Sequence, residues 1–288
     1  MRTKYILSTV AARTDIGLVR NNNEDNFLLS DLNANLILES PCSLERSPNE
    51  NQLLFIVSDG MGGYQNGELA SKLTIRAIQA ELIQLSQTSN PTTRLQKAIE
   101  EANRIVWEKS QTYTQLHMGA TATVLLIEGD NAYIAEVGDS RAYIIRGRRI
   151  KQLTKDQTAS QLCVDSGLLT PEEAISDVNR HILLQAVGSQ ELLQVPLTSI
   201  QLKYGDIFLL CSDGLFSKLR TDEMKNIIRQ CNSLDAAATS LIEKAKQYGG
   251  EDNITVLLVK FEGNALEINK RDEPITNKVR ILSSFTIN

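Results

Sequence analysis

A buried strand that ends in an acidic residue constrains this sequence more than any other feature. Residues 54–57 (Leu-Phe-Ile-Val) are four consecutive apolar residues, typical of a buried strand, and they run into Ser58-Asp59-Gly60. A carboxylate at a buried strand end is costly unless it has a partner. A tight turn begun by aspartate explains one such motif equally well. The pattern recurs at 209–214 (Leu-Leu-Cys-Ser-Asp-Gly), so we predict that Asp59 and Asp213 meet at one sheet end.

Composition narrows the class of protein. The chain has 288 residues, of which 42% are hydrophobic and 23% charged, which suits one large domain or two small ones. A net charge of −5 argues against binding to nucleic acid. The four cysteines form no Cys-x-x-Cys pair and there are only two histidines, which argues against a zinc site and a disulfide framework and favours a reducing compartment.

The sequence also argues against a membrane protein. No apolar run approaches the roughly 18 residues that span a bilayer. Residues 1–8 contain too short an apolar core for a secretion signal. We therefore predict a cytoplasmic protein that does not bind membranes.

Apolar spacing predicts a mixed α and β chain. Ile75, Ile78, Leu82 and Leu85 share one helical face, and Asn90-Pro91 is typical of the start of a second helix. Short turns at 129–131 and 138–140 separate strands between 119 and 145, and turns this short predict antiparallel hairpins. The remaining predicted strands cover 5–12, 26–29, 206–212 and 254–259, and the remaining helices 221–231 and 234–247.

Three segments fall outside this pattern. Residues 39–51 hold two prolines and many polar groups, which predicts a surface loop before the central strand. Residues 154–190 are mixed and contain a capping-box pattern at Thr170. His181, just beyond that pattern, is interpreted as an ordinary exposed or capping histidine, because nothing near it resembles a nucleophile. Residues 263–288 form a tail to which the sequence gives no function.

Acidic residues border nearly every predicted strand end. If those ends converge, the like charges raise each other's pKa, and a bound cation is the natural remedy. Carboxylates and backbone carbonyls are the only ligands on offer, and they suit Mg²⁺ or Mn²⁺. Two such ions can polarise a water and clamp a phosphoryl oxygen, while Arg20 supplies a planar fork for phosphate. These residues favour metal-assisted phosphoester hydrolysis. The acidic residues are Glu24, Asp25, Asp59, Asp139, Asp213 and Asp252.

Six segments, taken in order, resemble the metal-dependent protein Ser/Thr phosphatase family of type 2C, and its bacterial branch in particular. Each segment alone is weak evidence, but six segments in the family's order are very specific. The resemblance extends over residues 8–262, approximately. The segments are 14–20 (Thr-Asp-Ile-Gly-Leu-Val-Arg) with 23–26 (Asn-Glu-Asp-Asn), 57–63 (Val-Ser-Asp-Gly-Met-Gly-Gly) with Gly67-Glu68, 118–121 (Met-Gly-Ala-Thr), 137–141 (Val-Gly-Asp-Ser-Arg), 211–215 (Cys-Ser-Asp-Gly-Leu) and 250–256 (Gly-Glu-Asp-Asn-Ile-Thr-Val).

The resemblance implies an α+β fold, a four-layer α-β-β-α sandwich in which two antiparallel sheets are flanked by helix pairs. It implies that residues 1–262 form the catalytic domain and that residues 154–190 form a mobile flap beside the cleft. It also implies that Asp59 bridges two metal ions, that the Gly60 carbonyl binds one of them, and that Asp213 and Asp252 bind the other. By the same resemblance, Glu24 acts through water, Asp25 supports this shell of ligands, and Asp139 and Asp213 hold a third ion. Arg20 is implied to hold the substrate phosphate.

The activity implied is hydrolysis of phosphoserine and phosphothreonine in proteins by a water activated between two Mg²⁺ or Mn²⁺ ions, with a third ion beside them. Such an enzyme opposes Ser/Thr kinases, and without any heptad pattern we expect a monomer. Met61 stands where eukaryotic members carry a histidine. We therefore expect a water at the Asp139 site to protonate the leaving alkoxide.

Two alternatives remain open. One is a narrower phosphatase that acts on a single regulator in a partner-switching pathway. Gly119-Ala120-Thr121 and the complete Arg20 segment favour the general enzyme over it. The other is a module that recognises phosphoproteins without turnover, against which the intact set of acidic residues argues.

Overall fold

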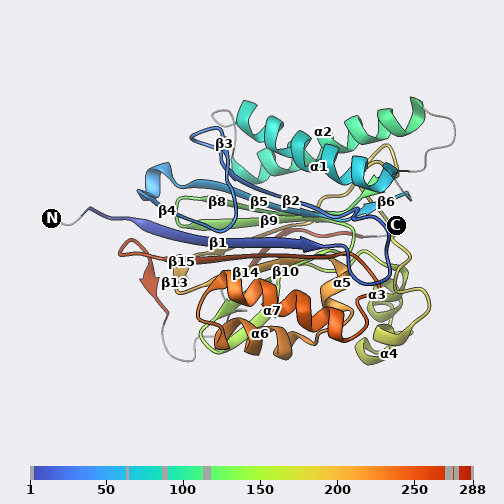
Figure 1. The fold of residues 1–288 in the computed structure, drawn as a ribbon. Coiled ribbons are helices and arrows are strands. Elements are labelled where there is room, and N and C mark those ends of the chain that lie inside the picture. Colours follow the sequence, from blue (N-terminus) through green and yellow to red (C-terminus); the bar gives the residue numbers. More distant parts are fainter. Residues whose placement is uncertain are drawn as a thin grey trace.

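The computed structural model describes residues 3–62, 65–85, 90–112, 118–269, 275 and 279–286. Two antiparallel sheets pack face to face, with α1 and α2 covering one and α6 and α7 the other (Figure 1). The seven-stranded sheet has the order β17 (Arg280–Ser283), β12 (Leu197–Gln201), β9 (Asn131–Val137), β8 (Ala122–Glu128), β5 (Gln52–Ser58), β2 (Asn26–Asp31), β3 (Leu36–Ile37). The six-stranded sheet has the order β11 (Arg149–Gln152), β10 (Arg141–Arg146), β14 (Ile207–Cys211), β15 (Ile254–Glu262), β1 (Ile6–Asp15), β4 (Cys42–Arg46).

Helices and two small strand pairs complete the chain. The pair β6 (Gly60–Met61) and β7 (Gly119–Ala120) is antiparallel, and β13 (Lys203–Tyr204) and β16 (Glu267–Ile268) are parallel. The helices are α1 (Gln65–Gln84), α2 (Pro91–Thr112), α3 (Ala159–Asp165), α4 (Pro171–Ser176), α5 (Asp213–Phe216), α6 (Thr221–Gln230) and α7 (Leu234–Gln247), with a short 3₁₀ helix at Pro48–Glu50.

The central strands are continuously apolar because both of their faces are buried. In β5, Leu54 and Ile56 pack against the α1–α2 layer, whereas Leu53, Phe55 and Val57 face the other sheet. Alternate side chains of β14 divide in the same way between the inter-sheet core and the α6–α7 layer. Three separate cores therefore hold four layers together, which confirms the predicted α-β-β-α sandwich.

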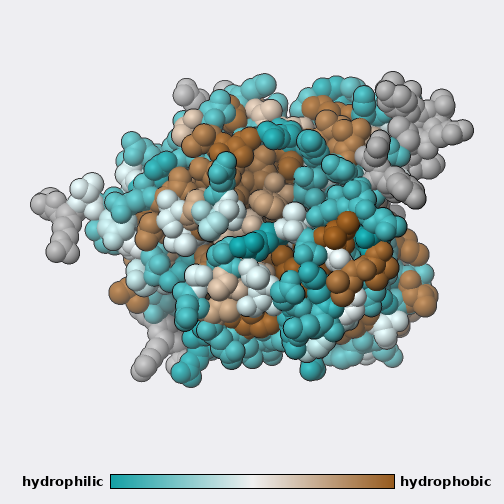
Figure 2. Space-filling model, in the orientation of Figure 1, coloured by the Kyte–Doolittle hydropathy of each residue, from teal (hydrophilic) through white to brown (hydrophobic). Residues whose placement is uncertain are grey.

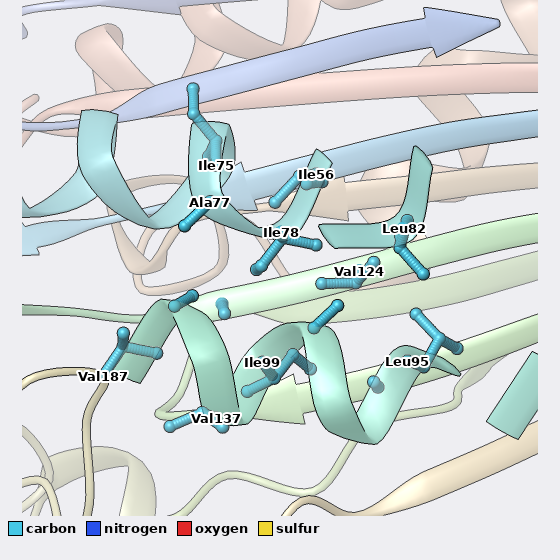
Figure 3. Close-up of a cluster of buried hydrophobic side chains, with 14 of the residues drawn as sticks. Ile56, Ile75, Ala77, Ile78, Leu82, Leu95, Ile99, Val124, Val137 and Val187 are labelled. Carbon is cyan, nitrogen blue, oxygen red and sulfur yellow. The ribbon is translucent and has the colours of Figure 1, made fainter. Parts of the chain in front are cut away.

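The helix faces predicted from spacing are the buried ones. Figure 3 shows Ile75, Ile78 and Leu82 of α1 and Leu95 and Ile99 of α2 in one cluster with side chains of the seven-stranded sheet, among them Ile56 and Val124. Burial of these aliphatic side chains contributes roughly 1.5–3 kcal/mol each. The capping box at Thr170 is also present and begins α4, with Pro171 as its first residue.

Residues 39–51 correct the predicted surface loop. Residues 42–46 form β4, an edge strand paired with β1 in the register Cys42 to Val10. Its alternate residues are half-buried, a pattern that the neighbouring prolines and polar residues obscured. Beyond residue 262 the chain adds β16 and β17, and Ile275 is buried in the core between the sheets. This segment therefore packs on the sandwich.

The predicted hairpin at 138–140 is also wrong. β8 and β9 do pair as an antiparallel hairpin, but β9 pairs with β12 on its other side while β10 pairs with β11 and β14. Residues 138–140 instead carry the chain from one sheet to the other. The loop between β1 and β2, residues 16–25, crosses in the same way. Both crossings lie at the same end of the sandwich (Figure 1).

Candidate active site

The predicted acidic residues meet where the chain crosses between the sheets. Asp59 follows β5 and Asp213 follows β14, and these strands belong to different sheets. The expected meeting at one sheet end is therefore wrong in that detail: the two carboxylates approach across the sandwich. Asp139 lies in the 138–140 crossing and Asp25 ends the 16–25 crossing, so four separate segments contribute to the site.

Burial and mutual repulsion act on the pKa values of these carboxyls. Desolvation raises the pKa of Asp59 well above its usual range, and the neighbouring charges of Asp25, Asp213 and Asp139 raise it further. The pKa of Asp139 is raised well above its usual range by desolvation first and then by Asp213. Desolvation raises the pKa of Asp25 to about 7. The acids therefore share a small volume that disfavours their charged forms.

Two glycines explain why the Ser-Asp-Gly motif appears twice. A Cβ added to Gly60 would lie 2.0 Å from the carbonyl oxygen of Gly67 and 2.7 Å from that of Glu24. A Cβ on Gly214 would lie 2.0 Å from the carbonyl oxygen of Asn253. In both motifs the missing side chain lets another backbone segment reach the aspartate. The Gly60 N–H also donates a hydrogen bond to the Glu24 carbonyl at 3.2 Å.

Asp25 is held by two hydroxyls that the sequence analysis did not assign. Ser212 Oγ and Thr255 Oγ1 donate to Asp25 Oδ2 at 2.7 and 2.6 Å. The Thr255 N–H donates to Ser212 Oγ at 2.9 Å, which ties β14 to β15. Ser212 stands in the second Ser-Asp-Gly motif, but the partners of its hydroxyl lie 187 residues away or in another strand. Sequence spacing carries no signal for such contacts.

Thr121 has a comparable role beside Asp59. The Asp59 N–H donates to Thr121 Oγ1 at 2.9 Å and the Thr121 N–H donates to the Asp59 carbonyl at 2.8 Å. Thr121 Oγ1 also hydrogen-bonds Ser140 Oγ at 2.7 Å. The threonine of the Gly-Ala-Thr segment thus joins Asp59 to the crossing that carries Asp139.

Two buried carboxylate oxygens remain without a hydrogen-bond donor in the described part of the chain, Asp25 Oδ1 and Asp213 Oδ1. A buried carboxylate oxygen without a partner is costly, and a cation satisfies it. Within the described ranges no three His, Cys, Asp or Glu side chains are close enough together to hold one ion alone. A backbone carbonyl such as that of Gly60, with water, would have to complete the ligand set, which is usual for hard divalent ions.

Arg20 lies at the rim of this site. Its Nη2 donates to Asp252 Oδ2 at 2.8 Å, and 55% of its side chain is exposed. The hydrogen bond to Asp252 raises the Arg20 pKa. The neighbouring Leu18 and Val19 are exposed as well, and brown groups gather near this loop in Figure 2. Glu24 is half-buried beside it, with a pKa raised mainly by desolvation.

The segment 154–190 packs beside the acidic residues through Arg141. This guanidinium makes two hydrogen bonds to Asp156, at 2.8 and 2.6 Å, and lies 3.7 Å over the Phe216 ring of α5. A cavity of about 890 Å³ separates α3 and α4 from α5 and reaches Asp139 and Asp213. His181 is exposed, as expected, but its Nδ1 lies 3.5 Å from Asp213 Oδ2, a proximity that the sequence did not predict.

Comparison with known proteins decides the family. A family model described as Protein phosphatase 2C matches residues 14–162. The chain belongs to the protein phosphatase 2C family. The serine/threonine phosphatase stp of Listeria monocytogenes is 34% identical over 86% of this chain and 94% of that protein. The serine/threonine protein phosphatase PstP of Mycobacterium tuberculosis is 34% identical over 86% of this chain and 44% of that protein.

Solved structures agree with this assignment. A crystal structure of the M. tuberculosis phosphatase PstP has a TM-score of 0.75 at 32% identity and covers 91% of this chain and 99% of that one. A structure of the PstP catalytic domain in complex with two manganese ions has a TM-score of 0.73 at 31% identity, covering 89% and 99%. The predicted bacterial-type family, fold and protein phosphatase class are confirmed. Among the described helices of this phosphatase, none has the length and apolarity to cross a membrane.

Proposed function

We propose that this phosphatase hydrolyses phosphoserine and phosphothreonine in proteins and opposes Ser/Thr kinases. The observation that carries the proposal is the convergence of acidic residues from both sheets, two of which have a buried oxygen without a donor in the described residues. Because raised carboxyl pKa values make the cation-free site unfavourable near neutral pH, the arrangement suits a polynuclear metal centre. The four cysteines are free, which supports a reducing, cytoplasmic setting.

We propose ligand roles that the position of the acidic residues and the family support. Asp59 would bridge two Mg²⁺ or Mn²⁺ ions, since the charges of several acidic residues, Asp25, Asp213 and Asp139 among them, raise its pKa. The Gly60 carbonyl would complete one site, and Asp213 with Asp252 would hold the other. Asp139, whose pKa is raised by the charge of Asp213 more than by that of Asp156, would share a third ion with Asp213.

The remaining groups position the substrate phosphate and support the metal ligands. We propose that Glu24 acts through water and that Asp25, fixed by Ser212 and Thr255, stabilises the shell. When bound, such ions lower the pKa of water and neutralise charge on the phosphoryl group. Arg20 keeps one N–H on Asp252 and has further N–H groups for the substrate phosphate. We propose that the protein acts as a monomer on phosphoproteins.

The test is hydrolysis of p-nitrophenyl phosphate and of a phosphothreonine peptide with Mn²⁺, Mg²⁺ or a chelator. Asp213→Asn should lose metal-dependent turnover of both substrates while remaining folded. Asp235→Asn is the matched control, since Asp235 pairs with Arg13 on the surface of α7 and should leave turnover unchanged. A folded wild-type protein without turnover in any metal would contradict the proposal and favour a module that binds phosphoproteins.

A further inference from the structure

A second cavity lies at the opposite end of the six-stranded sheet from the acidic site. It has a volume of about 1060 Å³ and is walled by the β10–β11 turn, the junction of α6 and α7, β13 and the end of β15. We call it the basic cavity, defined by Arg146–Arg149, Arg229, Cys231–Leu234, Tyr204, Lys260 and Ile268. Figure 1 shows β13, which forms part of its wall, at the left end of the sandwich, and β6 and α5, which begin at Gly60 and Asp213, towards the right.

The basic cavity carries an excess of positive charge. Of its lining residues, Arg146 pairs with buried Asp206, and Lys260 pairs with Glu262. The other three cations, Arg148, Arg149 and Arg229, are exposed and form no ion pair within the described part of the chain. On a chain of net charge −5, three uncompensated guanidinium groups around one hollow make a local anion-attracting field.

The charges are held in position. Arg229 Nη1 donates to the Gly147 carbonyl, which fixes α6 against the β10–β11 turn. The first turn of α7, in which Ser233 Oγ accepts from the Ala236 N–H at 3.1 Å, forms the adjoining wall. It contributes the positive end of the helix dipole, and its one acidic residue, Asp235, is paired with Arg13. Preorganised donors cost less to order when a ligand binds.

The rest of the lining favours a peptide over a simple anion. Tyr204 and Ile268 are exposed at the rim, 46% and 80% respectively. Apolar contacts beside the guanidinium groups match the side chains of a peptide.

We propose that the basic cavity binds an acidic segment of the phosphoprotein substrate, remote from the phosphorylated residue. The inference rests on the proposed phosphatase function and names the class of substrate: phosphoproteins with a run of Asp or Glu. β10 begins at Arg141 beside the acidic site and ends at Arg146 in the basic cavity, about 17 Å at 3.3 Å per residue. A substrate must therefore place more than about five extended residues between the two segments.

The experiment measures kcat and KM for phosphothreonine peptides that carry a tri-glutamate tail, attached either directly or after a Gly/Ser spacer of 12 residues. The directly attached tail reaches at most about 11 Å, which is too short, whereas the 12-residue spacer alone reaches about 40 Å. Simultaneous engagement should lower the KM of the long-spacer peptide about tenfold in the wild type. The effect should disappear in Arg148→Gln/Arg149→Gln and at high salt, with kcat on p-nitrophenyl phosphate unchanged.

The matched control is Lys72→Gln/Arg76→Gln, which removes two exposed charges from α1 on the other side of the sandwich and should keep the tenfold effect. The proposal would be overturned if the two peptides had equal KM values in the wild type, or if both double variants lost the KM difference between the peptides to the same extent. Fluorescence anisotropy of the unphosphorylated tail peptide tests the cavity without turnover. Binding that survives Arg148→Gln/Arg149→Gln overturns it, whereas absent turnover of p-nitrophenyl phosphate counts against the catalytic function alone.

Discussion

Alanine in place of Gly60 inserts a methyl group where three backbone segments meet beside the acidic site. Its Cβ would lie 2.0 Å from the Gly67 carbonyl oxygen and 2.7 Å from that of Glu24. Ordinary contact begins at 3.4 Å, so the first pair must separate by 1.4 Å. Neither obstacle is a flexible side chain, so we expect the upper part of the roughly 1–3 kcal/mol range for overpacking.

The separation also moves the Gly60 carbonyl and the end of the 16–25 crossing, which carries Glu24 and Asp25. We therefore expect Gly60→Ala to weaken Mn²⁺ binding at least about tenfold, as the loss of supporting contacts around a metal does elsewhere. Isothermal titration with Mn²⁺ measures the affinity, and calorimetric melting in chelator measures the stability, at roughly 2–4 °C per kcal/mol.

Gly129→Ala is the control for the methyl group itself. Gly129 has a φ of +61° and its nearest neighbour would be 3.5 Å from the added Cβ, so only the backbone conformation is strained. We expect a loss of about 1–2 kcal/mol with unchanged Mn²⁺ affinity. Wild-type Mn²⁺ affinity and melting temperature in Gly60→Ala would refute the close-approach explanation of the Asp-Gly motif.

Three further predictions follow from the electrostatics and caps. Burial raises the Asp25 pKa to about 7, so between about pH 4 and 7 the folded, metal-free protein retains a proton that the unfolded chain has released. The stability of the metal-free protein should therefore fall as pH rises through this window, and Mn²⁺ should restore it. Melting temperatures measured from pH 4 to 8, with and without a chelator, test this. A melting temperature that rises with pH in the presence of the chelator would contradict it. Asp206→Ala leaves Arg146 buried without its carboxylate partner. The free energy of unfolding, measured in urea, should fall by about 3–5 kcal/mol, and the Mn²⁺ affinity should stay unchanged. A loss below about 1 kcal/mol would mean that Arg146 finds another acceptor. Thr170→Ala removes the capping box and should destabilise α4 by about 1 kcal/mol, seen as faster amide exchange in α4 alone, and unchanged exchange there would show that the cap contributes nothing.

Local pattern was sufficient for much of this fold. The apolar run 54–57 and the spacing of Ile75, Ile78 and Leu82 identify a doubly buried strand and a helix face, because period and burial are properties of neighbouring residues. The helix starts at Pro91 and Pro171 were likewise readable, since capping acts within one turn. The strand at residues 42–46 was not predicted, because only alternate residues of this edge strand are half-buried. That pattern is a weak signal among prolines.

The candidate site was predictable as a set of residue types but not as an arrangement. Acidic residues at the ends of predicted strands indicated the site, and six segments in a characteristic order indicated the family. Comparison with known proteins confirmed the family. Only the tertiary structure decided that β5 and β14 lie in different sheets, that residues 138–140 cross between them, and that Ser212 reaches Asp25 across 187 residues. The physical reason is that strand pairing and crossing depend on contacts between distant segments, whereas periodicity and capping depend on neighbours within a few residues.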